Sequence, residues 1–245
     1  MFDMHLNLDL DFSGMEFGGV DANDIDLGHF DIAGMYDEET RYVKPKLFAM
    51  KKNYILYDNA TKLAKDLKLA EGERFDAIVN GSFIFGDFIE AYVTEHNAKC
   101  KKMTISTLSL SQENIDSLEN LIEWNYVDEL NVIISAYFFS HYRGSLVRYM
   151  YEHLDKCNKF QLAVAGVHTK TCQFETLGGK KIVMHGSANL HSSGNIEQFT
   201  IEENKELYDF YDDVFGNILD RYATINKQIR GKELWRTINN DIKTS

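Results

Sequence analysis

The chain has 245 residues, 44% of them hydrophobic, which is enough to bury one sizeable core together with tails. It has no apolar run of the roughly 18 to 20 residues that a membrane span requires, and its start lacks the pattern of a signal peptide. We therefore expect a cytoplasmic protein without a membrane partner. The three cysteines and eight histidines are scattered, which predicts reduced thiols and neither a metal nor another cofactor.

The net charge of −12 lies almost entirely at the start of the chain. Residues 1–40 contain eleven acidic and no basic side chains, and the remainder carries a net charge of only −1. The last 25 residues hold six basic and two acidic side chains. This layout predicts an acidic, flexible tail over 1–45, a domain over 46–226 and a basic tail over 227–245. The acidic tail either solubilises the protein or mimics nucleic acid and occupies a binding groove.

The body of the domain alternates short apolar runs with amphipathic stretches, as βαβ architectures do. Strands rich in β-branched residues are predicted at 54–57, 75–80, 102–106, 130–135 and 160–165. Helices are predicted where apolar residues recur at spacings of three or four, around 88–92, 115–122 and 146–154.

After Ala165 the pattern changes to strand, turn and strand. Residues 171–175 and 182–186 are predicted to form an antiparallel hairpin, whose turn at 176–181 contains two successive glycines. A long helix should follow, with the apolar face Leu207, Phe210, Tyr211, Val214, Phe215, Ile218, Leu219 and Tyr222. The fold class is therefore α/β.

The hairpin carries an ordered set of polar residues that suits phosphodiester chemistry. They are His168-Thr-Lys170, then Glu175, then Gly186-Ser187-Ala188-Asn189 and finally Glu197. Displacing an ester oxygen from phosphorus requires a nucleophile, a proton donor and fixed positive charge around the other oxygens. The order and spacing resemble the HKD signature of the phospholipase D superfamily. The resemblance implies a mixed sheet flanked by helices and a metal-independent phosphodiesterase.

The resemblance also implies roles for individual residues. His168 would be the nucleophile that forms a phosphohistidine, and Glu197 would orient it and stabilise its charge. Lys170, Ser187 and Asn189 would bind the phosphate oxygens. Two supporting residues are Glu175, the motif's acid, and Ser192 in the following loop.

The sequence departs from the family pattern in two ways. Glu175 stands where the family most often has Asp, and the turn of the hairpin is about four residues longer than usual. Only one HxK is present, although the mechanism needs two histidines. Members with a single motif solve this by pairing, so we expect a homodimer whose two motifs meet at the two-fold axis.

The motif defines the bond that is cleaved and leaves the substrate open. Small single-motif members are mostly nucleases, and basic residues with Tyr222 and Trp235 near the C-terminus offer a modest nucleic-acid surface. The leading hypothesis is a nuclease acting on DNA or RNA. The alternatives are a catalytically inactive nucleic-acid or protein-binding module and a phospholipid hydrolase or transferase.

Three neighbours of the motif admit both functional and structural interpretations. His185 could line the pocket or serve the core or surface, and His191 could support the phosphate site from the loop that follows Asn189. Cys172 alternates with Lys170 along the predicted strand, but a small buried apolar role suits it better.

Overall fold

In the computed structural model, the residues described are 52–224 without 58, 80–82, 156–157 and 192–194, and for 52–57 the backbone only. The predicted acidic tail (1–45) and basic tail (227–245) lie outside these residues, so the domain bounds remain predictions. Ser192 lies outside them as well.

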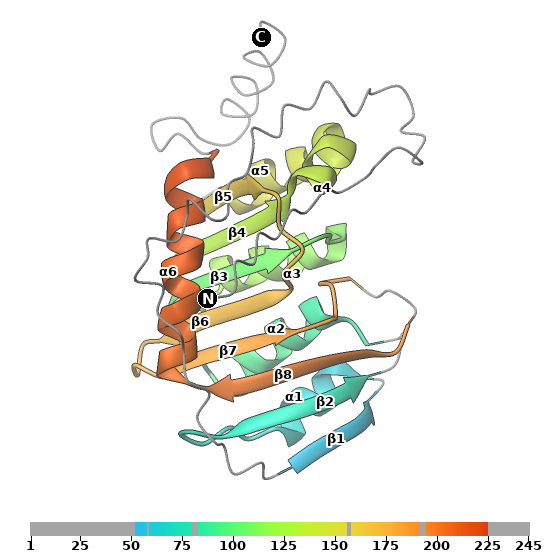
Figure 1. Cartoon of the computed structure of the whole chain (residues 1–245), viewed down its shortest axis with the longest axis vertical. Helices are drawn as coiled ribbons and strands as arrows, with labels where there is room; N and C mark the ends of the chain where they lie inside the picture. Colours follow the sequence, from blue (N-terminus) through green and yellow to red (C-terminus); the bar gives the residue numbers. More distant parts are fainter. Residues whose placement is uncertain (1–51, 58, 80–82, 156–157, 192–194, 225–245) are drawn as a thin grey trace, which may run out of the picture. The chain divides into compact units, whose positions relative to one another are not determined.

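The described residues form one mixed sheet with helices on both faces (Figure 1). Its strands are β1 (Lys52–Tyr57), β2 (Arg74–Val79), β3 (Cys100–Thr107), β4 (Leu130–Ser135), β5 (Phe160–Ala165), β6 (Thr171–Thr176), β7 (Lys181–Gly186) and β8 (Glu197–Glu203). The spatial order is β1-β2-β8-β7-β6-β3-β4-β5. Pairing is parallel in β1/β2 and β3/β4/β5, whereas β8, β7 and β6 form an antiparallel block between these two groups.

The helices are α1 (Ala60–Asp66), α2 (Phe85–Glu95), α3 (Gln112–Glu123), α4 (Ala136–Tyr142), the π-turn η3 (Arg143–Val147), α5 (Arg148–Leu154) and α6 (Lys205–Tyr222). Helices α1, α3, α4 and α6 begin where a short polar side chain caps a free NH group, whereas α2 and α5 have no such cap. Ser111 and Asn114 form a capping box at α3, Ser135 caps α4, and Asn204 caps α6.

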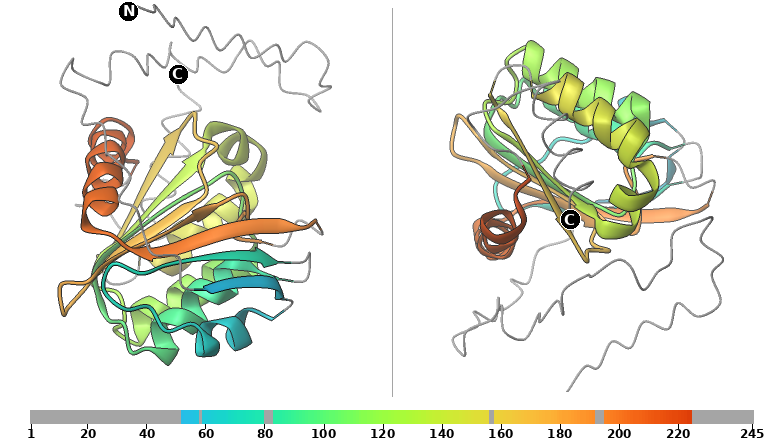
Figure 2. Two further views of the ribbon diagram at one scale, coloured as in Figure 1. Left: turned by 60° about the horizontal axis from the view of Figure 1, so that its bottom comes forward. Right: turned by 90° about the horizontal axis from the view of Figure 1, so that it is seen from above.

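The two faces of the sheet differ in chemistry. Helices α1, α2, α3 and α5 cover one face and α6 crosses the other (Figure 2). Alternation along the strands directs Ile105, Phe174 and Phe199 into the core under the first group. The α6 face carries buried polar side chains, among them Gln173 and Glu202, beside buried apolar ones such as Val183 and Phe215. The larger apolar cluster lies on the first face.

The expected fold class is confirmed, and β4 and β5 coincide with their predicted bounds. The predicted hairpin is also present, and Gly179 has φ = +82° in its turn, a conformation that glycine adopts without strain. Three elements were not predicted: the short helices α1 and α4 and strand β8. On α6, the most deeply buried side chains include Tyr208, which the predicted apolar face omitted.

Candidate functional site

The two halves of the motif lie side by side at one edge of the sheet. Lys170 immediately precedes β6, and Gly186 ends its antiparallel partner β7. The NH of Gly186 donates to the carbonyl oxygen of Lys170 at 3.2 Å. Because β3, β4 and β5 are parallel, this is also the edge at which their carboxyl ends meet, where α/β proteins usually place ligand sites.

His168 and Lys170 are in direct contact. The Lys170 Nζ lies 3.3 Å from His168 Nδ1 and donates to the His168 carbonyl oxygen at 3.3 Å. His168 is exposed, whereas Lys170 is partly buried. The pair therefore presents an imidazole at the surface with an ammonium group beside it.

The Lys170 ammonium is in a partly desolvated environment. Burial lowers the pKa of Lys170 from its usual value, because a charged amine loses hydration there, and the negative charge of Glu197 opposes this shift. The carboxylate of Glu197 is thus close enough to interact with the charge of Lys170, as expected if both residues belong to one site.

Ser187 and Glu197 join the ends of β7 and β8. The Ser187 hydroxyl donates to Glu197 Oε2, and the Ser187 NH donates to the carbonyl oxygen of Gln198 at 2.9 Å. The NH of Gln198 in turn donates to Ser187 Oγ at 3.1 Å. These bonds hold the Glu197 carboxylate at the same edge as His168 and Lys170.

Asn189 lies two residues after Ser187, in the loop that follows β7. Its Oδ1 is buried and has no hydrogen-bond partner within the described part of the chain. A buried amide oxygen without a partner costs free energy. The unsatisfied atom is an acceptor, so a contact with a phosphate oxygen would have to use the NH2 group of the same amide.

The loop after Asn189 is anchored by neighbouring helices. The carbonyl oxygen of Leu190 accepts from the NH of Gly86, at the start of α2, at 2.9 Å. The side chain of Asn114, in the first turn of α3, donates to the same oxygen at 3.4 Å. A Cβ at position 86 would collide with the Asn114 amide, so this anchor requires glycine.

Two hydroxyl groups at the end of β3 brace the site, and sequence reasoning did not identify them. Ser106 Oγ lies 2.6 Å from the Oγ1 atom of Thr169. Thr169 is the residue between His168 and Lys170 in the chain. Ser109 Oγ lies 2.9 Å from His191 Nε2 in the other half of the site. Their only signal in the sequence was that Ser106 ends a predicted strand and Ser109 follows shortly after it.

Other candidate residues lie elsewhere. Glu175 is at the opposite end of β6 from Lys170 and pairs with Lys101 at 3.3 Å, so it is remote from His168. His185 bonds Glu202, which is 2% exposed, at 3.2 Å on the α6 face. Cys172 is fully buried, as expected for a core residue, and burial raises its pKa.

The described residues contain no group of three or more His, Cys, Asp or Glu side chains that could hold a metal ion. Among the same residues, no helix has the length and apolarity to cross a membrane.

Comparison with known proteins finds likeness in structure only. No protein-family profile and no curated protein sequence matches the chain. Among solved structures, a phospholipase D family member, Nuc from Salmonella typhimurium, matches with a TM-score of 0.40 and 14% identity over 51% of this chain and 81% of its own.

Two larger proteins match as well. Polyphosphate kinase from Porphyromonas gingivalis has a TM-score of 0.45 and 12% identity over 69% of this chain. Phosphatidylserine synthase from Haemophilus influenzae Rd KW20 has a TM-score of 0.44 and 15% identity over 76% of this chain. The matches span 30% of the kinase and 47% of the synthase.

Proposed function

We propose that this chain is a metal-independent nuclease that cleaves DNA or RNA through a phosphohistidine intermediate, in a site completed by a homodimer. The observation that carries the proposal is the contact of His168 and Lys170 at an exposed sheet edge, with Glu197 in electrostatic reach. This edge combines a nucleophile, a fixed cation and a carboxylate, which are the groups that phosphoryl transfer needs.

In the first step, His168 Nε2 attacks phosphorus and forms an N–P bond while the bond to the leaving oxygen breaks. The leaving oxygen takes its proton from the partner subunit's His168. Lys170 and the Ser187 hydroxyl stabilise the charge on the remaining oxygens. In the second step, water attacks the phosphohistidine, the partner subunit's His168 accepts its proton, and the N–P bond breaks.

The contact between His168 and Lys170 describes the resting state. When Nδ1 accepts from the ammonium group, a neutral imidazole carries its proton on Nε2 and has no Nε2 lone pair with which to attack. A bound phosphate competes for the Lys170 ammonium and releases Nδ1. Nδ1–H can then donate to the Glu197 carboxylate, which leaves the Nε2 lone pair free. Substrate binding thereby activates the nucleophile.

Nucleic acid is the favoured substrate because the same edge carries aromatic and basic side chains. Helix α4 begins where β4 ends (Figure 1), and its Tyr137 and Tyr142 are 52% and 43% exposed. The half-buried Arg143 follows, with its guanidinium carbon 5.9 Å from the centroid of the half-buried Phe139 ring. Exposed aromatic rings beside cations bind single strands by base stacking and phosphate attraction.

The test is cleavage of single- and double-stranded DNA and RNA in the presence of EDTA. Wild-type protein should cut at least one substrate, and His168→Ala should lose all measurable cleavage. His153→Ala is the matched control, because His153 lies on α5 and bonds Glu119 at 2.8 Å, outside the candidate site. A labelled substrate should also leave an alkali-stable, acid-labile phosphate on wild-type protein.

The alternatives predict different results from the same experiment. If neither protein cuts but both bind nucleic acid, the chain is an inactive binding module. If only headgroup release from phospholipid vesicles depends on His168, the chain is a lipid hydrolase or transferase. Either result overturns the nuclease proposal.

A further inference from the structure

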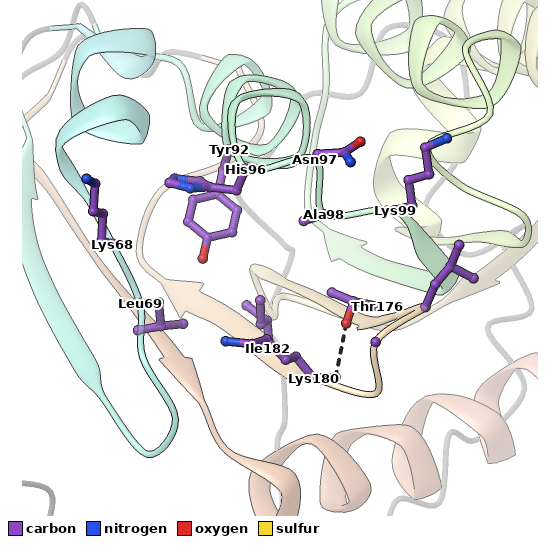
Figure 3. A pocket seen from close by; sticks show the side chains of 12 residues that line it. Lys68, Leu69, Tyr92, His96, Asn97, Ala98, Lys99, Thr176, Lys180 and Ile182 are labelled. Carbon is purple, nitrogen blue, oxygen red and sulfur yellow. Dashed lines mark hydrogen bonds between the residues drawn. The ribbon is translucent and has the colours of Figure 1, made fainter.

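Exposed aromatic rings are concentrated on helix α4, beside the candidate site. Among the Phe, Tyr and Trp side chains that the structure describes, only Trp124, Tyr137 and Tyr142 are exposed, at 54%, 52% and 43%. Two of these three, Tyr137 and Tyr142, lie on α4. By contrast, Tyr92 in the wall of the cavity at the opposite edge of the sheet is only 3% exposed (Figure 3). Helix α4 therefore offers ring faces that a ligand can reach.

The two tyrosine rings of α4 are held in place by their neighbours. The Tyr137 ring lies 4.0 Å from the His141 ring between centroids, and His141 Nδ1 donates to the carbonyl oxygen of Tyr137 at 2.8 Å. The Tyr142 ring lies 4.8 Å from the ring of Phe138, which is 1% exposed. Rings that are already ordered lose little conformational entropy when a flat group stacks on them.

Helix α4 is also close to the proposed nucleophile. Ser135 at the end of β4 is the register partner of Ala165 at the end of β5, and adjacent strands lie about 4.8 Å apart. Tyr137 follows Ser135 by two residues, and His168 follows Ala165 by three. The Cα atoms of Tyr137 and His168 are thus at most roughly 23 Å apart. A short nucleic-acid strand can contact both.

The same edge carries few cations. The segments that follow β3, β4, β5 and β7 there are 108–111, 136–151, 166–170 and 187–196, and they contain three Lys or Arg side chains and no Asp or Glu. One of the three, Arg148, pairs with Glu152 at 3.0 Å, which leaves Arg143 and Lys170. Binding of a duplex depends to a large extent on neutralising many phosphates, for which two cations per chain are few. A single strand gains affinity from base stacking, which requires no further charge.

We propose that the substrate of the site is a single strand, two bases of which stack on Tyr137 and Tyr142 while a phosphate lies at His168 and Lys170. A base inside a duplex has both faces covered by its neighbours, whereas an unpaired base can place one face on an exposed ring. Since the substrate of the proposed function is nucleic acid, this stacking rests on that function and restricts it to unpaired strands.

The test is fluorescence polarisation of labelled oligonucleotides with the His168→Ala protein at one fixed salt concentration. The probes are single-stranded DNA, single-stranded RNA and a DNA duplex, all of one sequence and length. We expect at least one single strand to bind roughly tenfold or more tightly than the duplex. A duplex that binds as tightly as both single strands would overturn the proposal. This outcome would leave the nuclease proposal standing, because the assay does not depend on cleavage.

Aromatic variants in the same background locate the stacking. Tyr137→Ala should weaken single-strand affinity roughly five- to 100-fold, as expected for the loss of one stacked base. Tyr137→Phe keeps the ring and should bind like its parent. Trp124→Ala is the matched control, since Trp124 is equally exposed but ends α3 before β4 starts at the opposite edge.

Salt dependence separates stacking from charge. The slope of affinity against salt concentration should be the same in Tyr137→Ala as in its parent, because no charge is removed. Tyr137→Ala protein that binds a single strand as tightly as Trp124→Ala protein would overturn the proposal. Single-strand binding that depends on Tyr137, in a chain whose wild type cleaves nothing, would overturn the nuclease proposal and leave the stacking intact.

Discussion

Ser106 Oγ, at the end of β3, lies 2.6 Å from Thr169 Oγ1, inside the segment that carries His168 and Lys170. Ser106 is 1% exposed, so its hydroxyl is fixed by the core of the sheet. The position of His168 is thus set by a strand that is 63 residues away along the chain.

Ser106→Ala should therefore reduce turnover more than substrate binding. Removing one buried hydrogen bond costs about 1 kcal/mol, and the same loss in positioning corresponds to a roughly fivefold lower kcat. Ser145→Ala is the control, because its hydroxyl donates to the Tyr142 carbonyl oxygen at 3.3 Å, within the turn around η3. Steady-state kinetics and urea unfolding separate the effects: an unchanged kcat with lower stability would assign Ser106 a purely structural role.

Gly186→Ala should destabilise the fold and abolish activity. A Cβ at this position would lie 2.6 Å from the Cα of Phe199 and closer still to the carbonyl oxygen of Gln198, so β7 and β8 would have to separate. Overpacking of this kind costs typically 1 to 3 kcal/mol. In the control Gly178→Ala, the nearest atom is the Thr176 hydroxyl at 3.8 Å. Thermal unfolding should lower Tm for the first variant and leave the second unchanged.

A shared active site predicts a nonlinear response to mixing. If each site needs the His168 of both subunits, a mixed dimer of wild type and His168→Ala is inactive. Co-refolding equal amounts should then leave about a quarter of the wild-type activity, against about half if each chain acted alone. Activity that falls in proportion to the wild-type fraction would contradict the shared site.

The charge on Lys170 should define the alkaline limb of the pH–rate profile. Burial lowers the pKa of Lys170 and Glu197 opposes this, so Glu197→Gln should lower that pKa further. The ammonium group is then lost at lower pH, and the alkaline limb of kcat/KM moves to lower pH. Glu152→Gln, on α5, should leave the limb in place. A limb that does not move would mean that another group titrates there.

The His185–Glu202 pair should govern stability in acid. Burial acts to raise the pKa of Glu202, but hydrogen bonds from His185 and Asn204 outweigh it and hold the pKa below its usual value. A carboxyl group with a lowered folded-state pKa stabilises the fold above its unfolded pKa, and this stabilisation is lost as pH falls through the folded value. His185→Ala raises the pKa of Glu202 towards its unfolded value, so the variant should have a lower Tm near neutral pH, and its Tm should fall by less than that of wild type as the pH is lowered. Identical Tm profiles against pH would contradict this coupling.

The sequence predicted the elements whose pattern is local. Strands β4 and β5 are continuous apolar runs, and both were located to the residue. Strand β8 was missed because Glu197, Glu202 and Glu203 mask the alternation of Phe199 and Ile201. Its stability comes from pairing with β2 on one side and β7 on the other, which only tertiary structure provides.

The same limit applies to the site. The sequence motif predicted His168, Lys170, Ser187 and Glu197 as site residues, and the structure places them at one edge of the sheet. Ser106 and Ser109 could not be identified as neighbours, because only the long-range pairing of β3 with β6 brings them there. Conversely, Glu175 follows His168 and Lys170 closely in sequence but is distant from them in space. The extended strand β6 carries the chain from one edge of the sheet to the other between Lys170 and Glu175.

Strand β8 also gives the molecule a folding order. It lies between β2 and β7, so the N-terminal pair β1–β2 has no link to the rest of the sheet until residues 197–203 are in place. The same seven residues carry Glu197. A chain emerging from the ribosome consequently cannot complete its sheet before it acquires the carboxylate of the site. Partly synthesised chains should therefore have no catalytic activity, and activity should appear only once β8 has completed the sheet.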